Sequence, residues 1–317
     1  MSDCHKLFED YYKKISLTDA KKQNLRKARK QLRDKIRKYF EEKKGEKPPL
    51  FRGQGSFYME TIVNPLPGGE YDIDDGVYLQ NLKENKSDWP SPETVHEWIL
   101  QAIKGHTDKE PKDKRTCIRV LYSADYHVDL PIYGIENGVA YLAVKQEGWS
   151  ESDPKSFIDW FEGRLEVHGE QLRRIICYLK TWADFKKGSM LSGVAFTVSA
   201  SNNFTASVRD DKALVATARQ MKSQLQRERS INKPVVPYEN LVGDWTDQEI
   251  DDFIHKLDFL IQKGEEAIRS DDEEEASECW REVFGDRFPK GEPKMNPAQT
   301  ASVLYSSSKT PAKPWLR

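Results

Sequence analysis

The sequence predicts an α+β protein with two lobes, in which a mixed β-sheet precedes a bundle of helices. The chain has 317 residues, which is too long for one average domain and too short for three. Between residues 50 and 145, short runs of β-branched and aromatic residues are separated by turn signals, as in a sheet. From Asp153 onward, the pattern is helical.

Residues 1–48 are predicted to carry a long spine helix that begins after Thr18, a candidate N-cap. An apolar residue recurs at helical spacing from there to residue 39, at Leu25, Ala28, Leu32, Ile36 and Tyr39. The other faces are basic, and residues 1–48 hold 16 Lys and Arg against 8 Asp and Glu. We expect a solvated face on a helix that packs along the body, with a nucleic-acid-binding arm as the alternative.

Residues 49–150 are predicted to form the sheet. Strands are expected at 72–79, 116–122, 126–135 and 139–144, with a hairpin turn at Glu136–Gly138. A helix is expected between the first two strands, because Ser91 can cap it, Pro92 suits its first position and Gly105 follows its end.

Residues 151–288 are predicted to form the helical lobe, interrupted by a proline-marked extended piece at 232–241. Thr246 and Glu249 form a capping box at the start of one helix. Residues 289–317 are rich in Pro, Ser and Lys, and a flexible tail is expected there. The tryptophans on apolar stripes are expected in the core, namely Trp98, Trp160, Trp182, Trp245 and Trp280.

Composition excludes several classes of protein. The formal net charge is −2, so bulk electrostatics predicts no affinity for nucleic acid. No stretch approaches 18 apolar residues, and the first residues lack the apolar region of a signal peptide. The four cysteines form no C-x-x-C pair, so neither a zinc site nor a disulfide framework is expected. We therefore expect a soluble, reduced, cytoplasmic protein.

Three acidic residues on predicted strands are the candidate catalytic and metal-binding residues. Asp72 and Asp74 share one face of a strand, while Asp75 points to the opposite face and is a poor candidate. Asp129 lies between Val128 and Leu130 on a later strand, where a carboxylate is costly unless it is paired or bound to metal. Three convergent carboxylates suit Mg²⁺, and two such ions would activate a hydroxyl and stabilise a leaving pyrophosphate.

A glycine-rich turn upstream strengthens this interpretation. Gly55 and Ser56 precede Asp72 by sixteen positions, and a Gly-Ser turn that opens a helix offers backbone N–H groups and a hydroxyl to phosphate oxygens. An ordinary turn is the alternative explanation when this segment is taken alone.

Together, GS at 55–56, DID at 72–74 and VDL at 128–130 resemble the polymerase-β-like nucleotidyltransferases. The segments QGSF, DIDDGVYL, HVDLPIY, RRIICYLKTW, LSGVAFTV, KPVVPYENL and FGDRFP follow the order found in the CD-NTases of CBASS anti-phage systems. The resemblance covers residues 15–290 and is nearest to the bacterial cyclic GMP-AMP synthase branch. It implies a bilobal fold with a nucleotidyltransferase core and an active site between the lobes. The zinc insertion of the animal enzyme is missing, so DNA sensing is not implied.

The resemblance also implies roles for single residues. Asp72, Asp74 and Asp129 would bind two Mg²⁺ ions, for which Mn²⁺ could substitute, and Asp129 would deprotonate or orient the attacking ribose hydroxyl. Gln54 and the Gly55–Ser56 pair would contact the donor triphosphate, together with Lys180 in YLKTW and Ser192 in LSG. A surface lysine is the alternative for Lys180.

The expected activity is the joining of NTPs, ATP with GTP or another NTP, into a cyclic di- or trinucleotide with release of pyrophosphate. A linear transferase acting on RNA ends or making oligoadenylate-like products is one alternative, which the basic residues 1–48 favour. A degenerate, non-enzymatic scaffold is the other, and the intact acid triad argues against it. A monomer is expected, with no membrane and no stable DNA binding, and an accessory protein could grip the C-terminal tail.

Three further residues near these motifs have open roles. Arg52 is expected to be a phosphate ligand or part of a structural ion pair. Tyr58 is expected to stack on a base or to lie in the core. His127, two residues before Asp129, is assigned a structural role in preference to one behind the metal ligands.

Overall fold

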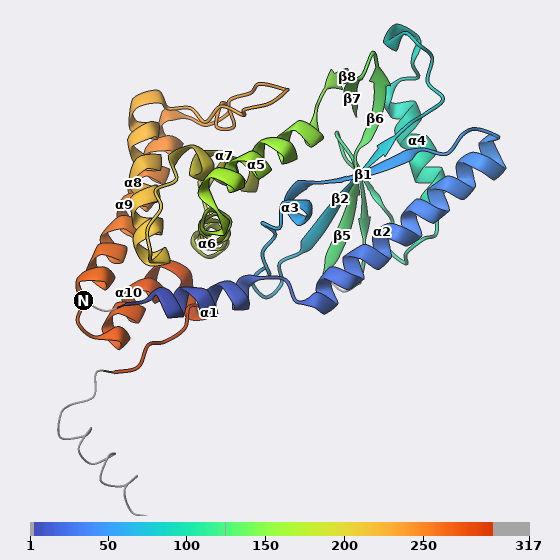
Figure 1. The fold of residues 1–317 in the computed structure, drawn as a ribbon. Coiled ribbons are helices and arrows are strands. Elements are labelled where there is room, and N and C mark those ends of the chain that lie inside the picture. The colour runs from blue at the N-terminus through green and yellow to red at the C-terminus, as the bar shows by residue number, and fades with distance from the viewer. Residues whose placement is uncertain (1–2, 124, 294–317) are drawn as a thin grey trace, which may run out of the picture.

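The computed structural model describes residues 3–123 and 125–293, which form a sheet lobe and a helical lobe (Figure 1). The α+β class and the mixed sheet are therefore confirmed. In the described residues, no helix is long and apolar enough to cross a membrane.

The N-terminal segment contains two helices, where one spine helix was expected. Helix α1 (His5–Ile15) packs on the helical lobe, while α2 (Asp19–Tyr39) runs along the sheet lobe (Figure 1). Thr18 caps α2 as predicted, since its hydroxyl accepts a hydrogen bond from the Lys21 N–H. Helix α2 continues into the π-helical turn η1 (Phe40–Lys44) and ends at Gly45, whose φ is +63°. This segment therefore joins the two hydrophobic cores.

The sheet contains eight strands in the described part of the chain. They are β1 (Leu50–Gln54), β2 (Tyr71–Tyr78), β3 (Lys112–Asp113), β4 (Ile118–Leu121), β5 (Tyr126–Leu130), β6 (Ile132–Glu136), β7 (Val139–Val144) and β8 (Gly148–Glu151). Strands β5 and β6 both run parallel to β2 with the same register offset, and Pro131 separates them. The other pairs are antiparallel. The predicted hairpin turn is confirmed between β6 and β7, where Asn137 and Gly138 both have positive φ.

The two faces of the sheet have different partners. Helix α2 and helix α4 (Pro92–Ile103) cover one face and share its apolar core with Ile73, Val77 and Val128. Ser91 caps α4 and Pro92 opens it, as predicted. The opposite face carries Asp72 and Asp74 and looks toward the helical lobe, because side chains alternate along β2. Two short helices, α3 (Gly55–Tyr58) and η2 (Lys86–Asp88), complete this lobe.

The helical lobe follows β8 directly. It contains α5 (Pro154–His168), α6 (Glu170–Lys186), α7 (Gly193–Asn203), α8 (Asp210–Glu228), α9 (Asp247–Arg269), α10 (Glu273–Phe284) and η3 (Gly285–Arg287). The predicted capping box of Thr246 and Glu249 opens α9. Trp182 and Trp280 are fully buried in its core, while Trp98, Trp160 and Trp245 are partly buried.

The residues that follow Phe288 contact α10. The Gly291 N–H donates to Ser277 Oγ at 2.8 Å, and Lys290 forms an ion pair with Glu274 at 2.7 Å. Residues 294–317, which make up most of the expected tail, lie outside the described residues.

Candidate active site

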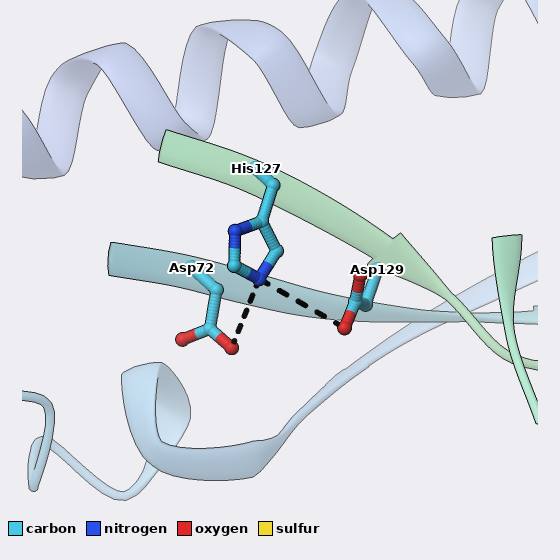
Figure 2. A group of neighbouring side chains, drawn as sticks. All are labelled: Asp72, His127 and Asp129. Atoms are coloured by element: carbon cyan, nitrogen blue, oxygen red, sulfur yellow. Dashed lines mark ion pairs between the residues drawn. The ribbon is translucent and has the colours of Figure 1, made fainter. Parts of the chain in front are cut away.

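Strands β2 and β5 bring the predicted acidic residues together. Their parallel register places Asp74 beside Asp129 and Asp72 beside His127. Partners at one register position of neighbouring strands point to the same face, so four polar side chains gather on the face turned toward the helical lobe. Figure 2 shows Asp72, His127 and Asp129 converging from the two strands.

His127 belongs to this cluster. Its Nε2 lies 3.6 Å from an oxygen of Asp72 and 4.0 Å from an oxygen of Asp129 (Figure 2). Its Nδ1 lies 3.0 Å from a carboxylate oxygen of Glu70, which orients the ring. Within the described residues Nε2 has no hydrogen-bond partner, although it is buried. One atom from each of Asp72, His127 and Asp129 lies within 4.8 Å of the others, a spacing that could hold a metal ion. The preference for a purely structural role for His127 is therefore not supported.

Asp74 lies at the centre of the negative charge. Burial, followed by the charges of Asp72 and Asp129, raises the pKa of Asp74 well above its ordinary value. A side chain at Gly55 would collide with it, because a Cβ there would lie 2.1 Å from an Asp74 oxygen. Three carboxylates that repel one another offer the oxygen donors that Mg²⁺ prefers. The residues present thus fit a divalent cation.

Arg119 is a site residue that sequence analysis missed. It lies opposite Asp129 in the antiparallel pair of β4 and β5, and its Nε and Nη2 donate to the two Asp129 oxygens at 2.8 and 2.7 Å. The available signal was an arginine inside the apolar run CIRVL, since a charged residue on such a strand needs a partner. Asp129 itself is only 7% exposed.

A cavity of about 1540 Å³ lies between the lobes and contains most of the predicted site. Its walls include the catalytic candidates Asp72 and Asp74 and all five nucleotide-binding candidates, Gln54, Gly55, Ser56, Lys180 and Ser192. This volume exceeds that of a typical site for one small molecule. Asp129 is not among the lining residues and lies beside Asp74 on β5.

Lys180 faces the cavity from α6. Its ammonium donates to the backbone oxygen of Thr61 at 3.1 Å and to the Thr61 hydroxyl at 2.9 Å. Burial lowers the pKa of Lys180 to about 8, despite the opposing charges nearby. A buried ammonium whose hydrogen bonds go to the uncharged oxygens of Thr61 is suited to bind a phosphate. Its contacts do not match a freely solvated surface lysine.

Ser192 stands beside Lys180 at the beginning of α7. Its hydroxyl caps the helix by accepting from the Ala195 N–H at 3.2 Å. A Cβ on the next residue, Gly193, would lie 3.5 Å from Lys180 Cε, so Lys180 passes close to the beginning of α7. Helix N-termini attract anions, and the positive charge of Lys180 adds to that attraction.

Gln54 and Ser56 line the same cavity from the end of β1 and from α3. Gln54 Nε2 donates to the Tyr133 hydroxyl at 3.2 Å, while its buried Oε1 has no partner among the described residues. Gly55 has a φ of +74°, which lets the chain turn directly from β1 into α3.

Three residues near the motifs lie away from the cavity walls. Asp75 is fully buried on the other face of β2 and pairs with Arg33 of α2, as its predicted orientation requires. Arg52 lies over the Tyr78 ring at 4.7 Å, so the structure supports neither role expected for it. Tyr58 packs with the core of the sheet lobe, which supports the core alternative.

In this chain, the parallel central strands of a mixed sheet present three carboxylates, and a Gly-Ser turn lies beside them. This arrangement is the nucleotidyltransferase core of the polymerase-β-like class, so the chain has that fold. Residues 49–133 match the family described as cyclic GMP-AMP synthase DncV-like, nucleotidyltransferase domain. These residues are therefore similar to the nucleotidyltransferase domains of the DncV-like family, and the resemblance to the bacterial cyclic GMP-AMP synthase branch of the CD-NTases is confirmed.

Curated relatives and solved structures agree with this assignment. A cyclic GMP-AMP synthase of Escherichia albertii is 29% identical over 233 residues, which are 69% of this chain and 51% of that protein. A cyclic GMP-AMP synthase of Vibrio cholerae is 24% identical and is covered over 69% of its length. The chain thus spans about half the length of the first of these relatives. The crystal structure of Vibrio cholerae DncV has the same fold, with a TM-score of 0.78 at 22% identity over 91% of this chain and 98% of that one.

Proposed function

We propose that this protein is a cyclic oligonucleotide synthase that joins NTPs into a cyclic di- or trinucleotide. The observation that carries the proposal is the shared cavity. Asp72 and Asp74 line it together with Gln54, Ser56, Lys180 and Ser192, and Asp129 lies beside Asp74 on the neighbouring strand. Support comes from relatives described as cyclic GMP-AMP synthases and from a DncV structure described as a complex with the linear intermediate 5′ pppA(3′,5′)pG.

The residues of the cavity divide into two groups with separate tasks. Gln54, Ser56, Lys180 and Ser192 would hold the donor triphosphate and fix the position of its α-phosphorus. Asp129 would accept the proton of the attacking ribose hydroxyl, or orient that hydroxyl, from the neighbouring strand. Holding the reactants in line accounts for much of the rate enhancement in such transfers.

Asp72, Asp74 and Asp129 would bind two Mg²⁺ ions, and Mn²⁺ could substitute for them. His127 lies close enough to bind or to orient the same ions. When bound, the ions neutralise the charge that develops on the phosphates. Without bound ions, burial and the charges of Asp72 and Asp129 disfavour the ionised form of Asp74 and so raise its pKa.

Cyclisation requires the same cavity twice. In the described residues we find one such acidic cluster, so the linear product of the first step must bind again. Its 5′-triphosphate would occupy the donor position, and its free hydroxyl would return to Asp129. The helical lobe opposite the sheet would hold both ends and exclude water.

A linear RNA-end transferase is the alternative that basic residues 1–48 favoured. In the structure, three of these arginines lie over aromatic rings. Arg26 lies over Phe57 at 5.5 Å, Arg29 over Tyr58 at 5.5 Å and Arg37 over Phe51 at 5.0 Å. These contacts leave fewer charges for an RNA backbone, which weakens that alternative.

The deciding experiment mixes the protein with Mg²⁺ and all four NTPs without a primer. We expect an early linear species that retains its 5′-triphosphate and decays as a phosphatase-resistant ring accumulates, as followed by mass spectrometry. Asp74→Asn is the inactive control. Linear products that lengthen steadily without a ring would contradict the proposal, and salt-dependent RNA binding in the same preparation would then favour the RNA-end transferase.

We further propose that the product serves as a second messenger in anti-phage defence in the bacterial cytoplasm. This rests on the CD-NTase resemblance. The proposed grip of an accessory protein on the C-terminal tail concerns residues outside the described ones.

A further inference from the structure

Arg287 is a positively charged residue of the cavity between the lobes, and the proposed reaction assigns it no role. It ends η3 and lines the same cavity as Lys180 and the carboxylates. Its Nη1 donates to the backbone oxygen of Asn64 at 2.6 Å. Its Nε and Nη2 are buried, and neither has a hydrogen-bond partner in the described part of the chain. In the described residues, no carboxylate oxygen thus lies within hydrogen-bond distance of Nε or Nη2 of Arg287.

A guanidinium with two buried nitrogens that lack hydrogen-bond partners is costly at the wall of a cavity. Removing its N–H groups from water without replacing their hydrogen bonds destabilises the folded protein. The free Nε–Nη2 edge has the shape that binds two oxygens of one phosphate or carboxylate. An anion that enters the cavity would supply the missing bonds.

Arg287 shares an electrostatic neighbourhood with Lys180. Asp184 follows Lys180 by one turn of α6, so both side chains lie on one face of that helix. Burial raises the pKa of Asp184, while the charges of Arg287 and Lys180 oppose the rise. Lys180, Asp184 and Arg287 all line the same cavity, so both cations can face one ligand with several charges.

The surrounding packing fixes Arg287 in place. Gly285 has a φ of +74°, and a Cβ there would lie 2.6 Å from a ring carbon of Phe185, so the chain can turn only with glycine at this point. Phe288, on the other side, packs against the Tyr11 ring at 5.2 Å and is fully buried. Its backbone oxygen accepts a hydrogen bond from Arg281 Nη1 at 2.7 Å. These contacts hold the backbone on both sides of Arg287, and the bond to Asn64 restrains the guanidinium, which lowers the conformational entropy that binding costs.

We infer that Arg287 binds the terminal phosphates of the donor nucleotide and then the pyrophosphate that leaves. The inference rests on the proposed function and names a further residue for it. In the transfer, the acceptor hydroxyl oxygen bonds to the α-phosphorus and its proton passes to Asp129. The bond from the α-phosphorus to the bridging oxygen breaks, and its electron pair stays on the departing pyrophosphate. Arg287 and Lys180 would share the charge that appears there.

The test measures the binding of inorganic pyrophosphate by calorimetry, with and without Mg²⁺, so that no turnover is needed. We expect Arg287→Gln to weaken binding by about tenfold or more, as for the loss of a charged hydrogen-bond donor. Arg287→Lys keeps the charge but loses the bidentate Nε–Nη2 edge. Its affinity for pyrophosphate should lie between those of the parent protein and Arg287→Gln. Arg219→Gln removes an exposed arginine of α8 that pairs with Glu265, and it should bind pyrophosphate like the parent protein.

Thermal denaturation of each variant guards against a purely structural effect of the contact with Asn64. Wild-type affinity for pyrophosphate in a folded Arg287→Gln would overturn the inference. If Arg287→Gln does not fold, the other two variants decide. Wild-type affinity in both Arg287→Lys and Lys180→Ala would then overturn it. A protein that binds pyrophosphate through Arg287 but makes no oligonucleotide from NTPs would refute the proposed function and leave this anion site standing.

Discussion

Arg119 and Asp129 face each other across strands β4 and β5, and two hydrogen bonds of 2.8 and 2.7 Å join the guanidinium to the carboxylate. Both Asp129 oxygens therefore accept a hydrogen bond from Arg119 in this structure. A metal ion that takes an oxygen of Asp129 must share the carboxylate with Arg119 or displace it. We therefore expect the bonds between Arg119 and Asp129 to stabilise the metal-free protein and to compete with metal binding at Asp129.

The first prediction concerns this pair. Arg119→Gln should lower the free energy of unfolding in EDTA by about 1.5–3 kcal/mol, the range for hydrogen bonds to charged groups. It should also enlarge the stabilisation by Mg²⁺, because Asp129 is then left unpaired beside Asp72 and Asp74. Thermal denaturation over a Mg²⁺ titration measures both effects.

Arg115→Gln is the matched control, since Arg115 is exposed and pairs with Glu147 at the surface. A Mg²⁺-dependent gain in Arg119→Gln no larger than that of the parent protein would show that Arg119 does not compete with metal.

The second prediction concerns Asp74. Asp74→Asn should reduce turnover by at least about a hundredfold, or roughly 3 kcal/mol, because a ligand of the metal cluster is lost. Stability in EDTA should be unchanged or higher. The pKa of Asp74 is raised above 3.8 in the folded protein, so folding takes up a proton there, and the parent protein loses stability as pH rises from 3.8 through the raised pKa.

That loss should be missing from Asp74→Asn, which denaturation between pH 4 and pH 8 can show. Asp159→Asn alters an exposed carboxylate of α5 paired with Lys155, and should keep both the activity and the pH dependence. An active Asp74→Asn would rule out the metal cluster as proposed.

Local features of the fold could be predicted from the sequence, because each depends on a few neighbouring residues. Thr18, Ser91 and Thr246 mark helix starts by their own hydrogen bonds. Alternation along β2 separates Asp72 and Asp74 from Asp75, and the structure keeps that separation.

Features that depend on distant partners could not be predicted. The parallel register of β2 with β5 decides that His127 meets Asp72, and it depends on pairing across more than fifty residues. Arg119 gains its role from a hairpin partner, and Arg287 from a loop of the other lobe. Helix α1 resembles a continuation of the spine in sequence, yet packing of Phe8 and Tyr11 against Tyr178 assigns it to the helical lobe.

The third prediction concerns the buried pair on the other face of β2. Arg33 Nε donates to Asp75 at 2.7 Å, and Asp75 has no exposed surface. Arg33→Gln should lower the free energy of unfolding by about 3–5 kcal/mol at pH 7, because it leaves a buried carboxylate without its partner. Urea denaturation measures the change.

The pH dependence follows from the sign of the shift. Burial raises the pKa of Asp75 while Arg33 opposes the rise, so loss of Arg33 raises it further. Protonation then relieves the unpaired charge, and the destabilisation should shrink as pH falls toward 4. The double variant Arg33→Gln/Asp75→Asn should recover part of the loss at pH 7. Arg26→Gln, which removes an exposed arginine stacked on Phe57, should cost at most about 1 kcal/mol.

The last prediction concerns Lys180 and pH. Lys180→Ala should weaken the binding of NTPs by about tenfold to a hundredfold, since a charged hydrogen bond contributes about 1.5–3 kcal/mol.

The pKa of Lys180 is lowered to about 8 by burial, so its ammonium is charged at pH 7 and mostly neutral at pH 9. A bound triphosphate favours the charged form, and binding above pH 8 must therefore take up a proton at a cost of about 1.4 kcal/mol per pH unit. KM for the NTP should accordingly rise about fivefold between pH 8 and pH 9, whereas Lys180→Arg, whose guanidinium stays charged, should show a flat profile over that range. Lys155→Ala, on the exposed face of α5, should follow the parent protein. Equal pH profiles for the parent protein and Lys180→Arg would show that another group titrates, and an unchanged KM in Lys180→Ala would remove Lys180 from the donor site.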